Sequence, residues 1–348
     1  MDIKASQTGM AGTDTLPDIY YIVPDSYASS RILGDLGYDN SGFTGYLNEM
    51  GFFIAQDSHS NYLHTELSLA STLNMQYLNG IEGALPGDSF PSFVYHDLAN
   101  EGEVLNTLRS LGYTIINTRD KWQIHDGIRS QLTCADRSST TLQSENYARS
   151  LLGTTALYPV LRYFNVVERQ IWDQRLCEFS MIVDVKDVEG PKFVFSHLRV
   201  PHPPFIFDRN GLRDPCSLSE TEFADKPDEY VDQLVFVNKK LREVVQAILS
   251  EKENPPIIII QADHGTRLGS PSSDEELYRV RFGIFNALHL PNGGNESLYD
   301  SISPVNTFRV ILDRYFGTEY GLLEDRSFYT DEPFAGSTHD DVTGLIRR

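Results

Sequence analysis

Two features that would place a chain in a membrane or mark it for export are missing from this sequence of 348 residues. The longest aliphatic run, Ile257 to Ile260, falls far short of the roughly 20 apolar residues that a spanning helix needs. The first residues, MDIKASQTGMAGTDTL, lack the apolar core of a signal peptide. The sequence as it stands predicts a soluble chain that carries no address of its own.

Cysteine is also scarce. The three cysteines, Cys134, Cys177 and Cys216, cannot form the disulfide framework that stabilises small secreted domains. One bridge remains an option, so cysteine usage leaves the redox compartment undecided.

Positive charge is under-represented, because 29 Lys and Arg face 49 Asp and Glu and the formal net charge is -20. Such a field repels nucleic acid and anionic lipid headgroups, so nucleic acid is not expected as a partner. A phosphate-type substrate would require cations in the site to reverse the local potential, which favours a bound metal. The alternative is that the acidic residues serve only to keep the protein soluble.

Apolar residues are plentiful, at 40% of the chain with 18 Tyr and 19 Phe, and they suffice for a large core. Short apolar runs alternate with amphipathic segments along the sequence. This alternation predicts an α/β fold with a mainly parallel central sheet and helices on both faces. The expected strands are 19–23, 52–55, 113–117, 192–197, 256–262 and 280–290, and the expected helices are 41–50, 66–77, 101–111, 157–177, 230–250 and 304–316.

The pattern predicts one large domain over residues 17–330. Residues 1–16 are small and polar, which indicates a flexible leader or linker remnant. Residues 331–348 are acidic and then basic without a periodic pattern, so we expect a loosely held tail. The polar stretch from Thr118 to about Glu189 is expected to be a decoration near the site.

Metal-type ligands follow two of the expected strands. Asp25 comes after IYYIVP, and Asp263 and His264 come directly after PIIIIQA. Function in open α/β sheets collects at the carboxyl ends of strands, where loops converge. Buried carboxylates are costly unless they are paired or bind a metal, which favours a metal site. Asp25 by itself is also typical of an ordinary turn or cap.

Thr65 opens an expected helix, whose free amide groups favour an anion. Its hydroxyl could attack phosphorus if a metal lowers the pKa, whereas the plain alternative for a Thr before Glu66 is a helix cap. Two histidines, His197 and His202, follow the buried run KFVFS. A lone loop histidine is usually solvated, but prolines on both sides of His202 predict a rigid loop that presents its ring. We expect His202 to be the more important of the two.

Along the chain, the four segments that contain Asp25, Thr65, His202 and Asp263-His264 resemble the sulfatase-like branch of the alkaline phosphatase superfamily. The resemblance is in particular to bacterial membrane-anchored hydrolase and transferase catalytic domains of the phosphoethanolamine and glycerolphosphate transferase type. The segment TELSLASTL, which begins at Thr65, is similar to that family's pattern of a nucleophile, two residues, Ser, and then small residues and Leu. The resemblance covers residues 17–330 as a sulfatase-like catalytic domain. It implies that Thr65 and His202 are catalytic, that Asp25, Thr65, Asp263 and His264 bind metal, and that Asn61, His197 and Trp122 are weaker candidates for substrate binding.

The resemblance implies a metal-dependent phosphoric ester hydrolase or phosphotransferase with a phosphoryl intermediate on Thr65. The metal would be divalent, with Zn, Mn and Mg left open. True sulfatases carry Cys or Ser, converted to formylglycine, in a Cys-x-Pro-Ser-Arg context, and Thr65 cannot undergo that conversion. The alternatives are a sulfuric ester hydrolase that lacks formylglycine and a non-catalytic domain that binds a cell-envelope polymer.

The implied substrate is a phosphate-type ester, with a lipid-linked or glycan-linked organic group as one option. Full-length relatives are membrane-anchored, so the resemblance suggests an extracytoplasmic domain of a bacterial membrane protein. Hydrolase and transferase remain open because both share the first chemical step. Further ligands of a two-metal centre are not matched, since Asp18 precedes its strand and His197 and His59 are only candidates.

Overall fold

A computed structural model describes residues 16–79, 99–118, 166–212, 226–250, 254–268, 271–330 and 339–346. Its centre is a sheet whose described strands follow the order β2-β8-β7-β1-β4-β3. These strands are β1 Ile19–Pro24, β2 Phe53–Ile54, β3 Thr114–Asn117, β4 Lys192–Leu198, β7 Ile257–Gln261 and β8 Asn286–His289. Strands β1, β3, β4 and β7 run parallel, while β8 is antiparallel to β7 and β2. The predicted α/β class with a mainly parallel sheet is confirmed.

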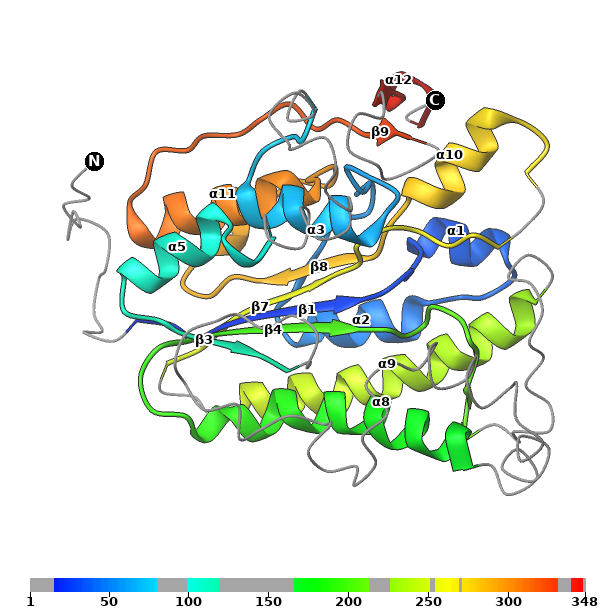
Figure 1. Cartoon of the computed structure of the whole chain (residues 1–348), viewed down its shortest axis with the longest axis horizontal. Coiled ribbons are helices and arrows are strands. Elements are labelled where there is room, and N and C mark those ends of the chain that lie inside the picture. The colour runs from blue at the N-terminus through cyan, green and yellow to red at the C-terminus, as the bar shows by residue number, and fades with distance from the viewer. Residues whose placement is uncertain are drawn as a thin grey trace, which may run out of the picture.

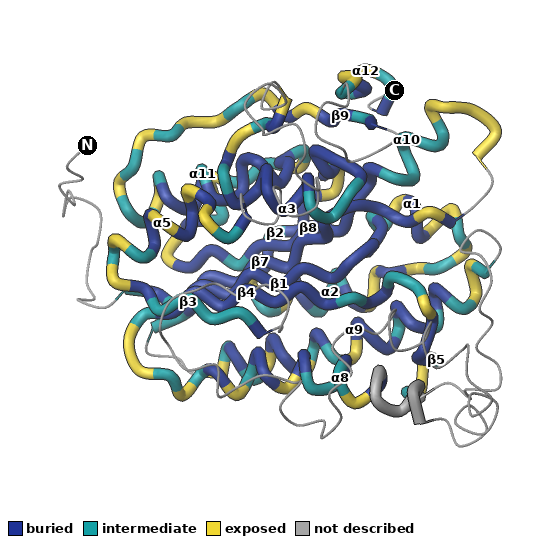
Figure 2. The backbone as a smooth tube through the Cα atoms, viewed as in Figure 1, coloured by how far each residue is buried: buried dark blue, intermediate teal, exposed yellow. Residues whose placement is uncertain are grey.

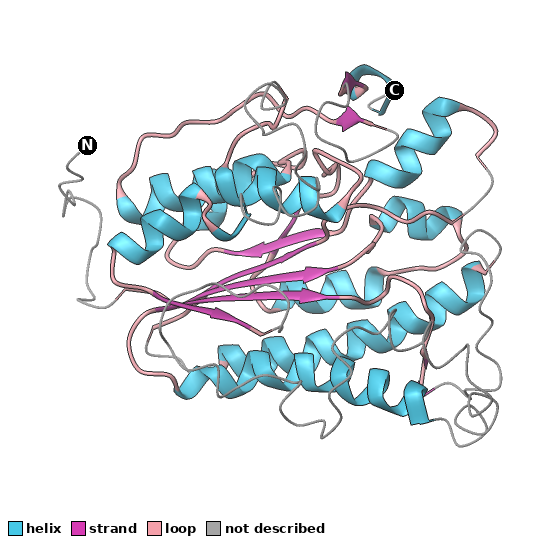
Figure 3. Ribbon diagram, viewed as in Figure 1, coloured by secondary structure: helices cyan, strands magenta, loops and turns pink. Residues whose placement is uncertain are grey.

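Two helical layers enclose the sheet, as Figures 1 and 3 show. The helices are α1 Ser30–Asp35, α2 Ser41–Glu49, α3 Thr65–Asn74, α5 Glu103–Ser110, α8 Val166–Asp184, α9 Pro227–Leu249, α10 Asp274–Phe282, α11 Pro304–Phe316 and α12 Thr343–Ile346, with 3-10 turns η2 Val185–Asp187 and η4 Gly294–Ser297. Strands β5 Phe207–Asp208 and β6 Gly211–Leu212 form a small antiparallel hairpin. Strand β9 Phe328–Tyr329 pairs antiparallel with β10 Asp340–Asp341.

The side chains of β1 show how the layers are held. Successive strand residues point to opposite faces, so Tyr20 and Ile22 join the apolar cluster of α2, α8 and α9. Tyr21 and Val23 join the second cluster, formed by α3, α5 and α11. Every residue of β1 is buried. Figure 2 shows burial along β1, β4 and β7, intermediate residues in the edge strand β3, and exposed residues on the outer helix faces. A run without alternating polarity is what a strand buried on both faces requires.

Local signals explain where the long helices begin and end. Helix α9 has Pro227 in its first turn together with Asp228 and Glu229, which suit the positive end of the helix dipole. Helix α11 also begins with a proline, and it ends at Gly317, whose φ of 66° lies in the left-handed region. None of the described helices combines the length and the apolar composition needed to cross a bilayer.

One strand prediction is partly wrong. Residues 280–290 were expected to form a single strand, but Val280 to Phe282 close α10 and β8 begins only at Asn286. The side chain of Ser273 accepts a hydrogen bond from the backbone N–H of Glu276, as in a capping box. This start signal is legible in the sequence and explains why the segment is helical.

The C-terminal segment packs against the body over its described residues. Strand β10 pairs with β9, and Val342 and Ile346 bury their side chains against Leu63 and Phe282. The part of the expected tail that the structure describes is therefore docked through apolar contacts. Of the helix predicted over 157–177, the described part is α8, which continues to Asp184.

Candidate active site

The carboxyl ends of β1, β4 and β7 bring three metal-type ligands together. Asp25 follows β1, His197 lies near the end of β4, and Asp263 follows β7. Because β1 is hydrogen-bonded to both other strands in parallel register, with Val23 opposite His197, these positions fall side by side. The imidazole Nε2 of His197 lies 3.4 Å from Asp25 Oδ2 and 3.7 Å from Asp263 Oδ2. All three residues are buried, and one ligand atom from each lies within 4.8 Å of the others.

His264 and Thr65 complete the cluster. The Nε2 atom of His264 lies 3.6 Å from Asp25 Oδ1 and 3.6 Å from Asp263 Oδ2. The hydroxyl of Thr65 donates to Asp263 Oδ2 at 2.6 Å and lies 3.4 Å from His264 Nε2. The structure therefore brings together Asp25, Thr65, Asp263 and His264, the four residues that the motifs predicted as one site.

The Thr65 hydroxyl does not act as a helix cap. Helix α3 begins at Thr65 itself, and its N-cap residue is His64, which makes no side-chain cap hydrogen bond. The hydroxyl of Thr65 is engaged by the Asp263 carboxylate instead. Placement at the first position of α3 directs the side chain across to the end of β7, where a nucleophile would face the metal-type ligands.

Two serines stabilise this arrangement through hydrogen bonds to the site residues. Ser68, one turn further along α3, donates to the main-chain carbonyl of Asp263 at 2.6 Å. The backbone N–H of Ser26 donates to Asp263 Oδ1 at 3.2 Å, and its hydroxyl lies 3.2 Å from Asp25 Oδ1 and 3.3 Å from His264 Nδ1. Ser26 thus contacts three site residues, and it does so with a left-handed φ of 63°.

Tyr230 of α9 fixes the turn that carries Ser26. Its hydroxyl donates to the carbonyl of Ser26 at 2.9 Å and accepts from the backbone N–H of Ala28 at 3.0 Å. The sequence reasoning missed both residues. A hydroxyl directly after a ligand at a strand end could have suggested Ser26, whereas nothing in the sequence links Tyr230 to a turn 204 positions earlier.

Charge in the site is partly compensated within the cluster. Burial lowers the pKa of His197, but hydrogen bonds to Asp25 and Asp263 and the charges of these carboxylates outweigh it and raise the pKa to about 10. Burial raises the pKa of Asp25, yet the nearby imidazoles of His202, His197 and His264 bring it well below its usual range. Both carboxylates are therefore ionised at neutral pH, with a protonated imidazole between them.

A divalent metal fits this group. Two buried carboxylates and imidazole nitrogens form a hard-to-intermediate donor set, as Zn, Mn and Mg prefer in varying degree. A metal ion binding there would displace the proton of His197, because imidazole binds metals in its neutral form. His197 was predicted only as a substrate-binding or additional-ligand candidate, and the structure places it among the metal-type ligands.

The other predicted residues lie in different settings. His202 adjoins the site: its backbone N–H donates to the carbonyl of Asp25 at 3.0 Å, and its ring centre lies 6.5 Å from that of His264. The side chain of Asn61 is buried, donating to the carbonyl of Arg326 and accepting from the N–H of Val305, so it ties loops together. Trp122 lies outside the described residues.

Two arginines and a histidine stand near the start of α3. Burial lowers the pKa of His64 to about 4, and the charges of Arg281 and Arg267 act in the same direction. Positive charge therefore gathers next to Thr65, although the whole chain is strongly acidic. His59 pairs through its backbone with Gly283 and is not part of the metal-type group found among the described residues.

Several solved structures of bacterial proteins have a similar arrangement of elements. The C-terminal periplasmic domain of EptC from Escherichia coli, in complex with Zn, is similar with a TM-score of 0.56 and 10% identity over 94% of this chain and 93% of that one. The chain has the alkaline phosphatase and sulfatase-like fold. The integral membrane lipooligosaccharide phosphoethanolamine transferase A (EptA) from Neisseria meningitidis is similar at a TM-score of 0.51 and 12% identity, over 88% of this chain and 55% of that protein.

A sulfatase candidate from Bacteroides fragilis, yidJ, has the same fold, with a TM-score of 0.51 and 11% identity over 93% of this chain and 83% of that one. No protein-family model and no curated protein matches the sequence. The resemblance drawn from the four motifs is thus confirmed at the level of the fold.

Proposed function

We propose that this chain is a metal-dependent phosphoric ester hydrolase or phosphotransferase that acts through a phosphoryl intermediate on Thr65. The observation that carries the proposal is the position of the Thr65 hydroxyl, 2.6 Å from the buried carboxylate of Asp263 and 3.4 Å from the imidazole of His264. A hydroxyl held against a carboxylate and an imidazole has a proton acceptor and a charged environment suited to a nucleophile.

Asp25, His197, Asp263 and His264 would hold the metal, with Thr65 alongside. When bound there, a divalent ion would lower the pKa of the hydroxyl and stabilise negative charge on the transferred group. The remaining tasks belong to the residues of the chain. Ser26 and Ser68 keep Asp263 in place through the bonds described above, so that the carboxylate faces Thr65.

The first step forms a bond between Thr65 Oγ1 and phosphorus, and the hydroxyl proton passes to the Asp263 carboxylate. The bond between phosphorus and the ester oxygen breaks, and that oxygen takes up a proton from Nε2 of His202. Nδ1 of His202 lies 2.6 Å from the carbonyl of Pro203, so this nitrogen carries a proton and Nε2 is the atom that can exchange a proton with the ester oxygen.

The second step releases Thr65. Water attacks phosphorus and gives a proton to Nε2 of His202. The bond between phosphorus and Thr65 Oγ1 breaks, and this oxygen takes back the proton held by Asp263. The products are free enzyme and a phosphate or phosphomonoester. An acceptor hydroxyl in place of water gives a transferase by the same bond changes. The name of EptA as a lipooligosaccharide phosphoethanolamine transferase supports phosphoryl chemistry on this fold.

Phosphorus is favoured over sulfur by the nucleophile. Thr65 cannot form the aldehyde hydrate that sulfatases use, whereas a threonine hydroxyl can be phosphorylated. Similarity to a sulfatase candidate keeps a sulfuric ester hydrolase without formylglycine as the second candidate. A non-catalytic polymer-binding domain is less favoured, because it would not require a hydroxyl so close to the Asp263 carboxylate.

We also propose an extracytoplasmic location, in a larger membrane-anchored protein. Cys177 is disulfide-bonded, which fits an oxidising compartment. The EptC neighbour is named as a periplasmic domain and EptA as an integral membrane protein.

A hydrolysis panel tests the proposal. Nitrophenyl phosphate, bis(nitrophenyl) phosphate and nitrophenyl sulfate would each be assayed with added Zn, Mn and Mg, for the wild type and Thr65→Ala. We expect turnover of a phosphate ester that falls by about 10⁴-fold or more in Thr65→Ala, as for loss of a nucleophile. Acid quenching followed by mass spectrometry should detect phosphate on Thr65. Near wild-type turnover in the variant, or hydrolysis of the sulfate ester alone, would contradict the proposal.

A further inference from the structure

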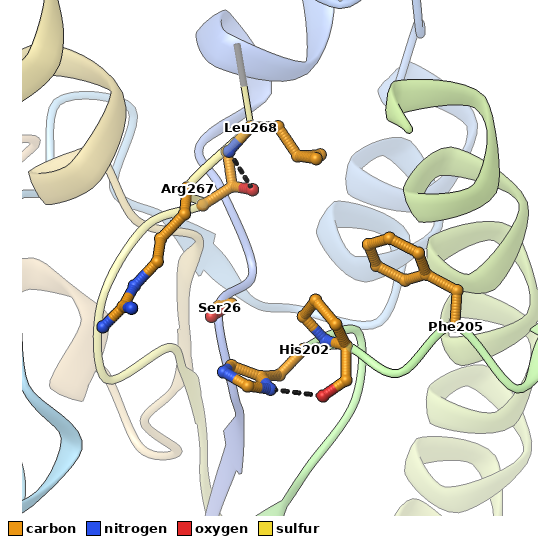
Figure 4. Close-up of a pocket in the computed structure, with 7 residues that line it drawn as sticks. Ser26, His202, Phe205, Arg267 and Leu268 are labelled. Atoms are coloured by element: carbon orange, nitrogen blue, oxygen red, sulfur yellow. Dashed lines mark hydrogen bonds between the residues drawn. The ribbon is translucent and has the colours of Figure 1, made fainter. Parts of the chain in front are cut away.

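The two proposed catalytic groups are positioned in different ways. His202 is fixed locally, because Nδ1 of its ring lies 2.6 Å from the carbonyl of the next residue, Pro203 (Figure 4). Thr65 is the first residue of α3, and the N-cap residue before it, His64, makes no side-chain cap hydrogen bond. The first turn of a helix without such a cap frays more easily, because its amide groups lack partners within the helix. The position of the Thr65 hydroxyl therefore depends on what fixes the loop that enters α3.

The C-terminal segment, defined here as residues 326–330 and 339–346, contacts this loop through its backbone. Asn61 of the loop is fully buried, and its Nδ2 donates to the carbonyl of Arg326 at 2.7 Å. The main-chain carbonyl of Asn61 accepts from the backbone N–H of Phe328 at 2.9 Å. The loop is thus bonded to the C-terminal segment by both its side chain and its main chain.

The contacts continue up to the nucleophile. The backbone of Thr330 forms a hydrogen bond with the ring of His64, the residue directly before Thr65. The side chain of Leu63 is buried in one apolar cluster with Val342 and Ile346. The C-terminal segment therefore contacts the chain at both residues that lead into α3.

Residues 339–346 stabilise the part of the segment that touches the loop. Strand β10 pairs with β9, and the backbone N–H of Val342 donates to the carbonyl of Ser327 at 3.0 Å. The backbone N–H of Ser327 donates to the hydroxyl of Thr343 at 2.9 Å. Loss of the apolar contact of α12 should therefore loosen β9 and, with it, the loop.

We propose that the C-terminal segment positions Thr65 for attack on phosphorus by fixing the entry to α3. This inference rests on the proposed function and adds a conformational control to the same site. With the segment docked, the first turn of α3 directs Thr65 Oγ1 at the metal-type group. With the segment undocked, that turn frays and the hydroxyl leaves the line of attack. Asp25, His197 and Asp263 keep their places, because they lie at the ends of β1, β4 and β7.

Ile346→Ala tests the proposal, and Ile248→Ala is its matched control. Ile346 is 6% exposed and Ile248 is 5% exposed, and each lies near the end of a helix and inside an apolar cluster. Ile248 belongs to the last turn of α9, which leads to the start of β7 and so to the opposite edge of the sheet. The two variants should lose similar apolar contact, but only Ile346→Ala should affect the entry to α3.

Turnover of bis(nitrophenyl) phosphate is measured with added metal, at a temperature where both variants remain folded. We expect kcat to fall by about 10- to 100-fold in Ile346→Ala, as for a misplaced catalytic group, with metal content unchanged. In Ile248→Ala it should stay within about twofold of wild type. Ile346→Val keeps most of the apolar contact and should recover most of the loss.

Hydrogen exchange measured by mass spectrometry reports the first turn of α3 without any turnover. The backbone N–H of Ser68 donates to the carbonyl of His64 at 2.9 Å and closes this turn. A peptide that spans residues 64–69 should exchange about tenfold faster in Ile346→Ala than in Ile248→Ala, because only the first variant opens the turn locally.

An equal loss of kcat in the two alanine variants, or equal exchange of residues 64–69, would overturn the assignment. Loss of metal from Ile346→Ala would also overturn it, because the segment would then act on the metal-type group. If the wild type hydrolyses no phosphate ester but exchange is faster only in Ile346→Ala, the proposed function fails and the control of α3 by the C-terminal segment stands. Absence of turnover together with equal exchange would overturn both.

Discussion

The two edges of the strands β1, β4 and β7 carry charged residues in different arrangements. At the amino edge, Lys192 Nζ lies 2.7 Å from Asp18 Oδ2, and the backbone N–H of Lys192 donates to Asp18 Oδ1. One carboxylate there meets one permanent cation. At the carboxyl edge, Asp25 and Asp263 both face the imidazole of His197. The imidazole Nε2 of His264 lies 3.6 Å from Asp25 Oδ1.

The difference separates a structural pair from a functional cluster. Asp18 retains 28% of its side-chain exposure, so water and Lys192 together satisfy it. Asp25 and Asp263 are almost fully buried, and among the described residues the titratable imidazoles and the charge of Arg199, which acts on Asp25, compensate them. Buried carboxylates in excess over permanent cations are expensive unless an external cation completes the site. The carboxyl edge is thus built for a ligand and the amino edge is complete without one.

Among the variants that test the difference between the two edges, His197→Ala should cause the largest loss of turnover. Removing the imidazole leaves the two buried carboxylates facing each other, which destabilises the fold and deprives the metal of a ligand. We expect turnover to fall by about 10⁴-fold or more when metal binding is lost. Metal content by atomic emission and melting temperature with and without added metal would measure both losses.

His289→Ala is the control for that variant. His289 ends β8, opposite Ile258 near the amino edge, and its Nδ1 contacts the carbonyl of Pro256 at 3.0 Å. It should reduce stability without changing metal content. Full metal binding in His197→Ala would show that the carboxyl edge needs only its carboxylates. This prediction reverses the initial expectation that His202 is the more important histidine.

His202→Ala should reduce turnover by about 10²- to 10⁴-fold, the range for a group that exchanges a proton with the ester oxygen. Because His202 lies beside the metal-type group instead of within it, metal content should stay at the wild-type level. Esters with nitrophenolate as leaving group need little protonation, so the loss should be smaller for them than for alkyl esters. An equal loss for both would mean that His202 acts on another atom.

The sequence could predict what local signals encode. Asp25, Asp263 and His264 directly follow apolar runs, so their place at the carboxyl edge follows from strand ends alone. His197 lies inside the expected strand 192–197, where alternation defines a face but not a neighbour across the sheet. Its partnership with Asp25 requires the strand order β7-β1-β4, which no local pattern contains. Tyr230 shows the same limit, because its contact with the turn of Ser26 depends on how α9 packs.

Ser26→Ala should lower turnover by about tenfold, since the hydroxyl contacts Asp25 and His264 while the backbone N–H to Asp263 is kept. Ser26→Gly is the matched variant. It also lacks the hydroxyl, but glycine adopts the left-handed φ of 63° without strain. Similar turnover in both variants, with Gly the more stable, would assign the loss to the hydroxyl. Recovery of activity in Ser26→Gly would assign it to backbone strain.

Lys192→Met should have the smallest effect on turnover and tests the amino edge. Methionine preserves the buried stem of Lys192, whose side chain is 5% exposed, but removes the ion pair with Asp18 and the hydrogen bond to the carbonyl of Val188. We expect the free energy of unfolding to fall by about 1 to 2 kcal/mol, because partly exposed Asp18 can be hydrated when its partner is lost. Adding Asp18→Asn should recover part of that loss, since the unpaired charge is then removed as well.

Urea unfolding measures the stability of the single and the double variant. The kcat/KM of Lys192→Met should remain within about twofold of wild type, an effect near the limit of ordinary surface substitutions. A tenfold decrease in turnover at full metal content would show that the amino edge is coupled to the site through the strands, and the division between a complete structural edge and a ligand-dependent functional edge would have to be abandoned.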